Sequence, residues 1–173
     1  MLRPVIMIGC GGSGQKSVRY IRDAVRRHLD HAGWKGDFPR SWQFIGLDTL
    51  EVQEAPGEIP VMPSSDYLSV SVGFSQFQAL ENALLAQHPV QNEGYRELIG
   101  WRPVADQVVV PLKDGAGQLR AVGRTAGIVS LATVVRPKLQ DAFTECAAGG
   151  PELQEVSTKL GVPVPPGTET PQP

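Results

Sequence analysis

A glycine-rich turn near the amino terminus constrains the fold of this chain more than any other feature. The turn Gly9-Cys10-Gly11-Gly12-Ser13-Gly14 follows the apolar run Val5–Ile8, which is typical of a strand buried on both faces. After the turn, apolar residues recur at helical spacing at Val18, Ile21, Val25 and Leu29. A second strand is predicted over residues 42–47, closed by Asp48. Strand, turn, helix and strand predict an α/β fold with a parallel sheet and a right-handed crossover.

The spacing of glycines in this turn is that of a phosphate-binding loop. Gly9, Gly11 and Gly14 form a G-x-G-x-x-G pattern in the required context, after a strand and before a helix. Glycine lets the backbone turn sharply and approach a phosphate closely, and the helix start offers unpaired N–H groups with a partial positive charge. The turn therefore predicts nucleotide binding. Close packing of strand against helix is the structural alternative for the same glycines.

Several nucleotide classes are compatible with the turn. A Walker A loop is disfavoured, because Gln15 separates the last glycine from Lys16 and turns the lysine by about 100° around the helix. A NAD(P)-dependent oxidoreductase places an acid at the end of the second strand, and Asp48 stands there, although far from the glycines. A ubiquitin-activating-like adenylating enzyme is a third possibility, but its usual Asp-x-Asp is absent at Asp48-Thr49-Leu50.

The remaining chain divides into short predicted elements. Residues 49–74 look irregular, a helix is expected within Ser75–His88, and residues 107–112 read as a strand or extended segment. A further helix is expected over about 118–135, restarted at Pro137 and running toward Cys146. Gly149-Gly150-Pro151 is expected to end the regular structure, and the five prolines after it to form a linker.

Charge and composition narrow the function classes. Eight Lys or Arg and three Asp fall in residues 1–40, whereas residues 41–95 hold seven acids and no Lys or Arg. The formal net charge is −2, so a nucleic-acid binder is disfavoured. Arg19, Arg22 and Arg26 form a stripe that we expect to be a solvated helix face. No apolar run reaches the ~20 residues of a membrane helix, and no signal peptide is recognisable, so we expect a cytoplasmic protein.

A second glycine cluster separates these possibilities. Gly115-Ala116-Gly117 is followed by five residues and then Gly123-Arg124. Together with Ile8–Gly14 and the strand ending in Asp48-Thr49, it resembles the amino-terminal part of the GTP-binding domain in the tubulin/FtsZ superfamily, specifically a bacterial tubulin-like protein. The resemblance covers about residues 4–135 through three short motifs in the same order.

The resemblance implies a Rossmann-like parallel sheet flanked by helices, a bound GTP with Mg²⁺, and head-to-tail self-association in the complete protein. It also implies a set of nucleotide-binding residues, with Lys16, Thr49 and Arg124 as further candidates. The principal residues are Gly9, Cys10, Gly11, Gly12, Ser13, Gly14, Gln15, Asp48, Gly115, Ala116 and Gly117.

Departures from the family pattern shape the expected domain organisation. We expect a nucleotide-binding domain over 1–148, with an insertion at about 49–105, and a Gly/Pro-rich linker or tail over 149–173. The signature Gly-Gly-Gly-Thr-Gly-Thr-Gly loop and the later acidic loop of the family are missing. The sheet is therefore expected to be incomplete at its carboxyl terminus, and GTP hydrolysis is not expected from this chain alone.

The sequence contains no recognisable catalytic constellation. Cys10 and Cys146 make neither a disulfide framework nor a metal quartet, and no histidine has ligand spacing with them. The catalytic residues are thus unknown and no metal ligands are assigned. A non-catalytic interaction module is the remaining alternative to a nucleotide-binding protein.

Overall fold

The computed structural model describes residues 2–53, 57, 59–71, 73–87, 100–109, 111–116 and 119–162. Its sheet has three parallel strands in the order β1 (Val5–Cys10), β2 (Trp42–Asp48) and β3 (Tyr67–Ser69). Ile8 lies opposite Ile45, and Leu47 lies opposite Leu68. The predicted α/β fold with a Rossmann-like parallel sheet is confirmed.

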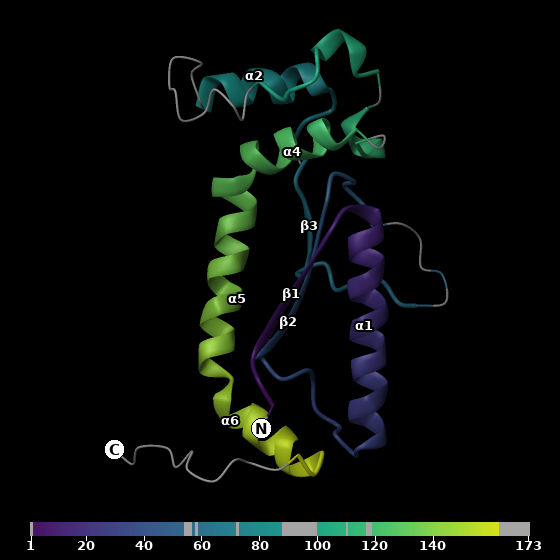
Figure 1. Ribbon diagram of the computed structural model, residues 1–173, viewed down its shortest axis with the longest axis vertical. Coiled ribbons are helices and arrows are strands. Elements are labelled where there is room, and N and C mark those ends of the chain that lie inside the picture. Colours follow the sequence, from purple (N-terminus) through teal and green to yellow (C-terminus); the bar gives the residue numbers. More distant parts are fainter. Residues whose placement is uncertain are drawn as a thin grey trace.

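Helices flank both faces of this sheet. Helix α1 runs along one face, α5 along the other, and α2 and α4 lie across the carboxyl ends of the strands (Figure 1). Helix α6 lies at the opposite end, near the amino terminus (Figure 1). Within the described ranges, the α-helices are α1 (Gly11–His31), α2 (Phe77–Gln87), α4 (Arg120–Val129), α5 (Arg136–Ala148) and α6 (Gly150–Lys159). The same ranges include the 3₁₀ turns η1 (Ala105–Gln107) and η2 (Leu112–Asp114) and the π-helical turn η3 (Leu131–Val135).

Helix α1 is held against the sheet by the apolar stripe that the sequence predicted. Val18 is buried against Phe44 and Met62, and Leu29 is buried at the far end with Trp34. Ile21, which shares the spacing, stays 40% exposed. Burying side chains of this size contributes about 1.5–3 kcal/mol each, which is enough to orient the helix.

A second apolar layer joins α2 and α4 above the strands. Phe77, Leu80 and Leu84 of α2 are buried, as predicted, and they form one cluster with Val122 and Ala126 of α4. Leu112 of η2 completes this core. The layer fixes α4 across the carboxyl ends of the strands, and so it positions the start of α4 beside the glycine-rich turn.

Two segments have a secondary structure different from the one expected. The interpretation of residues 49–74 as irregular is wrong at β3, because these three residues gain their backbone partners from β2 rather than from local propensity. In the described part of 107–112 there is no strand, and 3₁₀ turns stand at both ends of that segment. The helix expected over 118–135 is α4 followed by the π-helical turn, and Pro137 restarts the helix as α5.

The prediction that regular structure ends at Gly149–Pro151 is wrong, because α6 follows directly. Pro151 stands in the first turn of α6, where its missing N–H has no helical partner to lose. Leu153 and Val156 are buried, and Val156 contacts the cluster of Leu29 and Trp34. Residues 163–173, expected as a linker, lie outside the described residues.

The expectation of a solvated arginine stripe is wrong at Arg19. This side chain is only 6% exposed, and its guanidinium donates to the carbonyls of Ile59 (2.6 Å) and Pro60 (3.1 Å). The segment around Ile59 therefore packs over α1 and supplies acceptors that no helical periodicity could reveal.

An ion pair docks α6 onto the start of β2 and predicts a small pH dependence. Glu152 accepts hydrogen bonds from the backbone N–H of Arg40 (2.8 Å) and from its guanidinium (2.7 Å). The backbone hydrogen bond and then the guanidinium lower the pKa of Glu152 below its ordinary value of 4.5. A lowered folded-state pKa stabilises the protein above the unfolded pKa, and this contribution disappears as pH falls through the folded pKa.

We therefore expect Glu152→Gln to lower the melting temperature at pH 7 and to have no effect at a pH well below the lowered folded-state pKa of Glu152. The cost at pH 7 should stay below about 1 kcal/mol, because both side chains are substantially exposed and solvent screens the pair. Thermal unfolding of both proteins across this pH range measures the difference. A difference that persists at the acid end would contradict the assignment.

Candidate functional site

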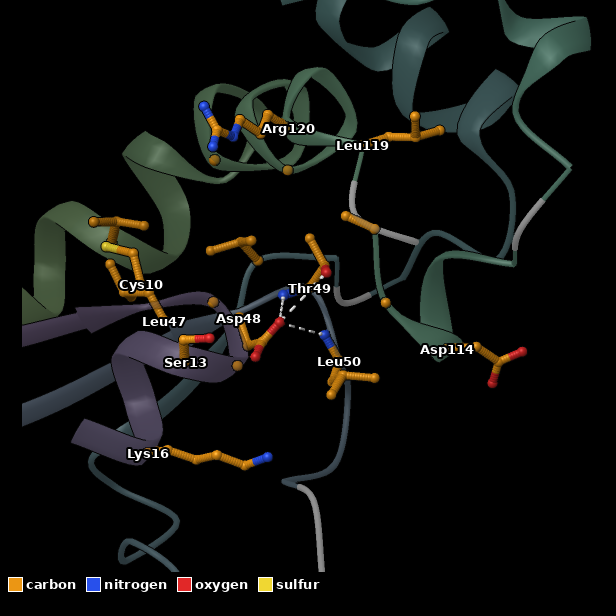
Figure 2. A pocket seen from close by; sticks show the side chains of 18 of the residues that line it. Cys10, Ser13, Lys16, Leu47, Asp48, Thr49, Leu50, Asp114, Leu119 and Arg120 are labelled. Atoms are coloured by element: carbon orange, nitrogen blue, oxygen red, sulfur yellow. Dashed lines mark hydrogen bonds between the residues drawn. The ribbon is translucent and has the colours of Figure 1, made fainter. Parts of the chain in front are cut away.

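A cavity of about 800 Å³ lies at the carboxyl end of the strands, between the start of α1 and helix α4. Its size falls within the range of ~300–1,000 Å³ that is usual for small-molecule sites. Figure 2 shows Ser13 and Lys16 of α1 on one side and Arg120 on the other. The lining residues are Cys10, Gly11, Gly12, Ser13, Lys16, Leu47, Asp48, Thr49, Leu50, Val70, Asp114, Gly115, Ala116, Leu119, Arg120, Gly123, Gly127, Leu131 and Val135.

The amino terminus of α1 forms the polar floor of this cavity. Cys10 is the N-cap residue, but no side chain caps the helix and its first turn contains no acid. The first N–H groups of a helix have no intrahelical acceptor, and a helix of 21 residues adds a partial positive charge there. Gly11 adopts a φ of +70°, which favours glycine at the turn. The residues Gly11, Gly12 and Ser13 therefore present donors suited to an anion.

Gly9 and Gly14 have a different role from the glycines between them. Neither lines the cavity. A Cβ on Gly9 would lie 2.3 Å from the carbonyl oxygen of Gly14, and a Cβ on Gly14 would lie 3.1 Å from the carbonyl carbon of Gly9. These two glycines let strand β1 and helix α1 approach backbone to backbone. They are thus supports of the turn, and the residues between them face the cavity.

Asp48 and Gln15 form a buried polar pair beneath the cavity. The Gln15 side chain is fully buried, and its Nε2 donates to Oδ2 of Asp48 at 3.0 Å. Oδ1 of Asp48 accepts the backbone N–H of Thr49 at 2.7 Å and that of Leu50 at 3.4 Å. Asp48 thereby shapes the turn after β2 while remaining part of the cavity wall (Figure 2). Gln15 does not line the cavity and supports Asp48 from behind.

Residues of the second glycine cluster line the same cavity as the first. Gly115, with a φ of +98°, and Ala116 both line it. Leu50 lies close to Gly115, because a Cβ there would be 3.4 Å from the leucine Cδ2. Gly117 lies outside the described residues. Two loops about a hundred residues apart in sequence thus form one site.

The three weaker candidates are placed differently. Lys16 and Thr49 line the cavity, whereas Arg124 does not. The guanidinium of Arg124 instead lies 4.9 Å from the ring centre of Trp101, a cation–π distance. Arg120, which belongs to none of the three motifs, lines the cavity in its place. A basic residue at the first position of a helix that follows a glycine loop was the signal available for it.

One wall of the cavity is apolar and includes the π-helical turn η3. Leu131 and Val135 of η3 line the cavity together with Val70 after β3. The hydroxyl of Ser130 donates to the carbonyl of Val70 at 2.6 Å and anchors the junction of α4 and η3 to the sheet. π-helical turns occur frequently at functional sites. Here the turn sets one boundary of the cavity.

The site contains no metal-binding cluster among the residues that the structure describes. No group of three or more His, Cys, Asp or Glu side chains is placed to hold a metal ion there. Of the described residues that line the cavity, Asp48 and Asp114 carry carboxylates. Binding of an anionic ligand is the chemistry that this arrangement supports.

Comparison with known families agrees with the geometry. The sequence model of the family described as tubulin-like matches residues 6–164, which is most of the chain. The protein belongs to the tubulin-like family. Neither the search of curated proteins nor the search of solved structures found a match.

Within the described part of the chain, no helix is both long enough and apolar enough to cross a membrane.

Proposed function

We propose that this protein binds GTP in the cavity between α1 and α4. The observation that carries the proposal is the uncapped start of α1, which opens through Gly11, Gly12 and Ser13 onto a cavity closed on its far side by the loop at Gly115. Backbone N–H groups of residues 11–13 would bind the α- and β-phosphates, and the second glycine loop would approach the terminal phosphate. Membership in the tubulin-like family supports GTP as the nucleotide.

We propose that a magnesium ion accompanies the nucleotide. Mg²⁺ usually keeps several waters and is held by substrate phosphates with one or two carboxylates. Asp48 and Asp114 line the cavity, but both oxygens of Asp48 accept hydrogen bonds, and the carboxylate of Asp114 is directed away from the start of α1 (Figure 2). The nucleotide phosphates and water would therefore hold the ion, which would neutralise phosphate charge. We extend the proposal to self-association with GTP bound, which sedimentation of the chain with and without nucleotide tests.

The alternative of a NAD(P) or adenine-nucleotide site is less well supported. In such sites the acid after the second strand binds the ribose diol. Here the carboxylate of Asp48 already accepts the amide of Gln15 and two backbone N–H groups. No observation in the described residues favours an adenine nucleotide over a guanine nucleotide.

Nucleotide binding can be measured by calorimetry and by protection of a thiol. We expect Mg²⁺-GTP to bind, and ATP and NAD to bind at least tenfold more weakly or not at all. Cys10 is exposed and lines the cavity, so bound GTP should slow its reaction with a thiol reagent. Cys146 is an internal control, because burial and then the charge of Glu145 raise its thiol pKa and reduce its reactive thiolate.

Two results would contradict the proposal. NAD binding without GTP binding would show that GTP is not the nucleotide. If calorimetry detects GTP binding but the reactivity of Cys10 is unchanged, GTP binds outside this cavity. If the reactivity of Cys146 changes to the same extent as that of Cys10, the effect is global and not due to occupation of the cavity.

A further inference from the structure

We propose that Arg120 binds the terminal phosphates of the ligand and gives the site its preference for a triphosphate over a monophosphate. The inference rests on the proposed function and assigns a specificity residue within the same cavity. Arg120 stands at the first position of α4, across the cavity from Ser13 and Lys16 of α1 (Figure 2). An anion held at the start of α1 would therefore extend toward it.

The side of α4 that faces the cavity leaves room for such a contact. Arg120, Gly123 and Gly127 all line the cavity, at spacings of three and four residues along one stripe of the helix. A Cβ on Gly127 would meet nothing within 4 Å, and one on Gly123 would meet only the Cβ of Ala116, at 3.9 Å. Beside Arg120, the helix surface is therefore bare backbone, and space for ligand atoms remains next to the guanidinium.

Arg120 is also available for a ligand. Within the described part of the chain it makes no hydrogen bond or ion pair, and its side chain is exposed. Arg124, one turn further along, is instead stacked on Trp101. A guanidinium binds two phosphate oxygens in parallel, which gives both affinity and orientation. Arg120 is therefore the arginine of α4 placed to act on the ligand.

The other charges of the cavity are consistent with an anion between α1 and α4. Lys16 adds a second positive charge from α1. The carboxylate of Asp48 faces Gln15 and the N–H groups of Thr49 and Leu50. Figure 2 shows the carboxylate of Asp114 directed away from the start of α1. Neither acid therefore stands between Ser13 and Arg120.

The test compares Arg120→Ala and Arg120→Lys with Arg124→Ala as the matched control. Calorimetry would use three probes with Mg²⁺, namely GTP, GMP and inorganic triphosphate. We expect Arg120→Ala to weaken GTP and triphosphate about tenfold or more and to leave GMP unchanged, since the lost contact is to the terminal phosphates. Arg120→Lys should recover part of the loss, and Arg124→Ala should bind all three probes as the parent does.

Each other outcome has a defined meaning. If Arg120→Ala binds GTP as the parent does, or loses GTP and GMP affinity equally, the assignment of Arg120 is overturned. If the parent protein binds inorganic triphosphate but not GTP, the proposed nucleotide function fails. In that case, a lower affinity of Arg120→Ala for triphosphate would still support the role of Arg120 in phosphate binding. A parent that binds neither probe overturns both. Circular dichroism melting of each variant checks that the fold is retained.

Discussion

Gly9→Ala is expected to destabilise the protein by about 3 kcal/mol or more, because the added methyl group would collide with backbone atoms. The added Cβ would lie 2.3 Å from the carbonyl oxygen of Gly14 and 2.8 Å from the backbone N of Gln15. Both contacts are to backbone, so no side chain can rotate away, and strand β1 must separate from α1. Overpacking commonly costs 1–3 kcal/mol and more where the backbone must move. Proteins are stable by only about 5–15 kcal/mol, so the loss is a large fraction.

Urea unfolding measures this loss, with Gly127→Ala as the control. A Cβ on Gly127 meets nothing within 4 Å, and alanine is favoured over glycine inside a helix by about 0.5–1 kcal/mol. The control should therefore be slightly more stable than the parent. An unchanged urea midpoint for Gly9→Ala would contradict the close approach of β1 and α1. In any fraction that folds, we also expect GTP to protect Cys10 less, because the start of α1 must shift.

Asp48→Ala is expected to cost about 3 kcal/mol and to abolish GTP binding. The substitution leaves Gln15 Nε2 and the N–H groups of Thr49 and Leu50 without their acceptor in a buried position. Hydrogen bonds to charged groups are worth about 1.5–3 kcal/mol, and an unsatisfied buried donor carries its own desolvation cost. The turn that forms this wall of the cavity would lose its anchor.

Asp48→Asn separates the hydrogen bonds from the charge. Asparagine keeps one oxygen for the backbone N–H groups and presents an amide to Gln15. Oε1 of Gln15 is buried without a partner, so rotation of the Gln15 amide would bring that oxygen onto the new donor. We expect a cost of about 1 kcal/mol by urea unfolding. A cost equal to that of alanine would show that the carboxylate charge, not the hydrogen-bond pattern, stabilises the turn.

The local sequence pattern was sufficient to predict the first three elements of the fold, β1, α1 and β2. The apolar run before Gly9, the helical spacing from Val18 to Leu29 and the strand closed by Asp48 are short-range signals, and β1, α1 and β2 follow them closely. The parallel sheet follows as well, because two strands joined by one helix pack in few ways. Helix α2 was predictable for the same reason, from the spacing of Phe77, Leu80 and Leu84.

Tertiary contacts decided the elements that local signals could not predict. Strand β3 has only three residues and gains its partners from β2, so its own composition carries little information. Helix α6 follows a Gly-Gly-Pro sequence that usually interrupts structure, yet Pro151 fits its first turn and Val156 packs on Leu29. Gly149 is also held close to the start of β2, since a Cβ there would lie 2.3 Å from Oγ of Ser41.

The candidate site shows the same division between sequence and tertiary structure. The resemblance carried by the motifs predicted both glycine loops and Asp48 as parts of one nucleotide site, and Gly11, Asp48 and Gly115 do line one cavity. Only the three-dimensional arrangement shows that Gly9 supports the turn from outside the cavity and that Gln15 is buried behind Asp48. It also shows that Arg120, not Arg124, lines the cavity. The physical reason is that motif spacing records which residues share a loop, whereas the direction of each side chain depends on how α4 packs over the sheet.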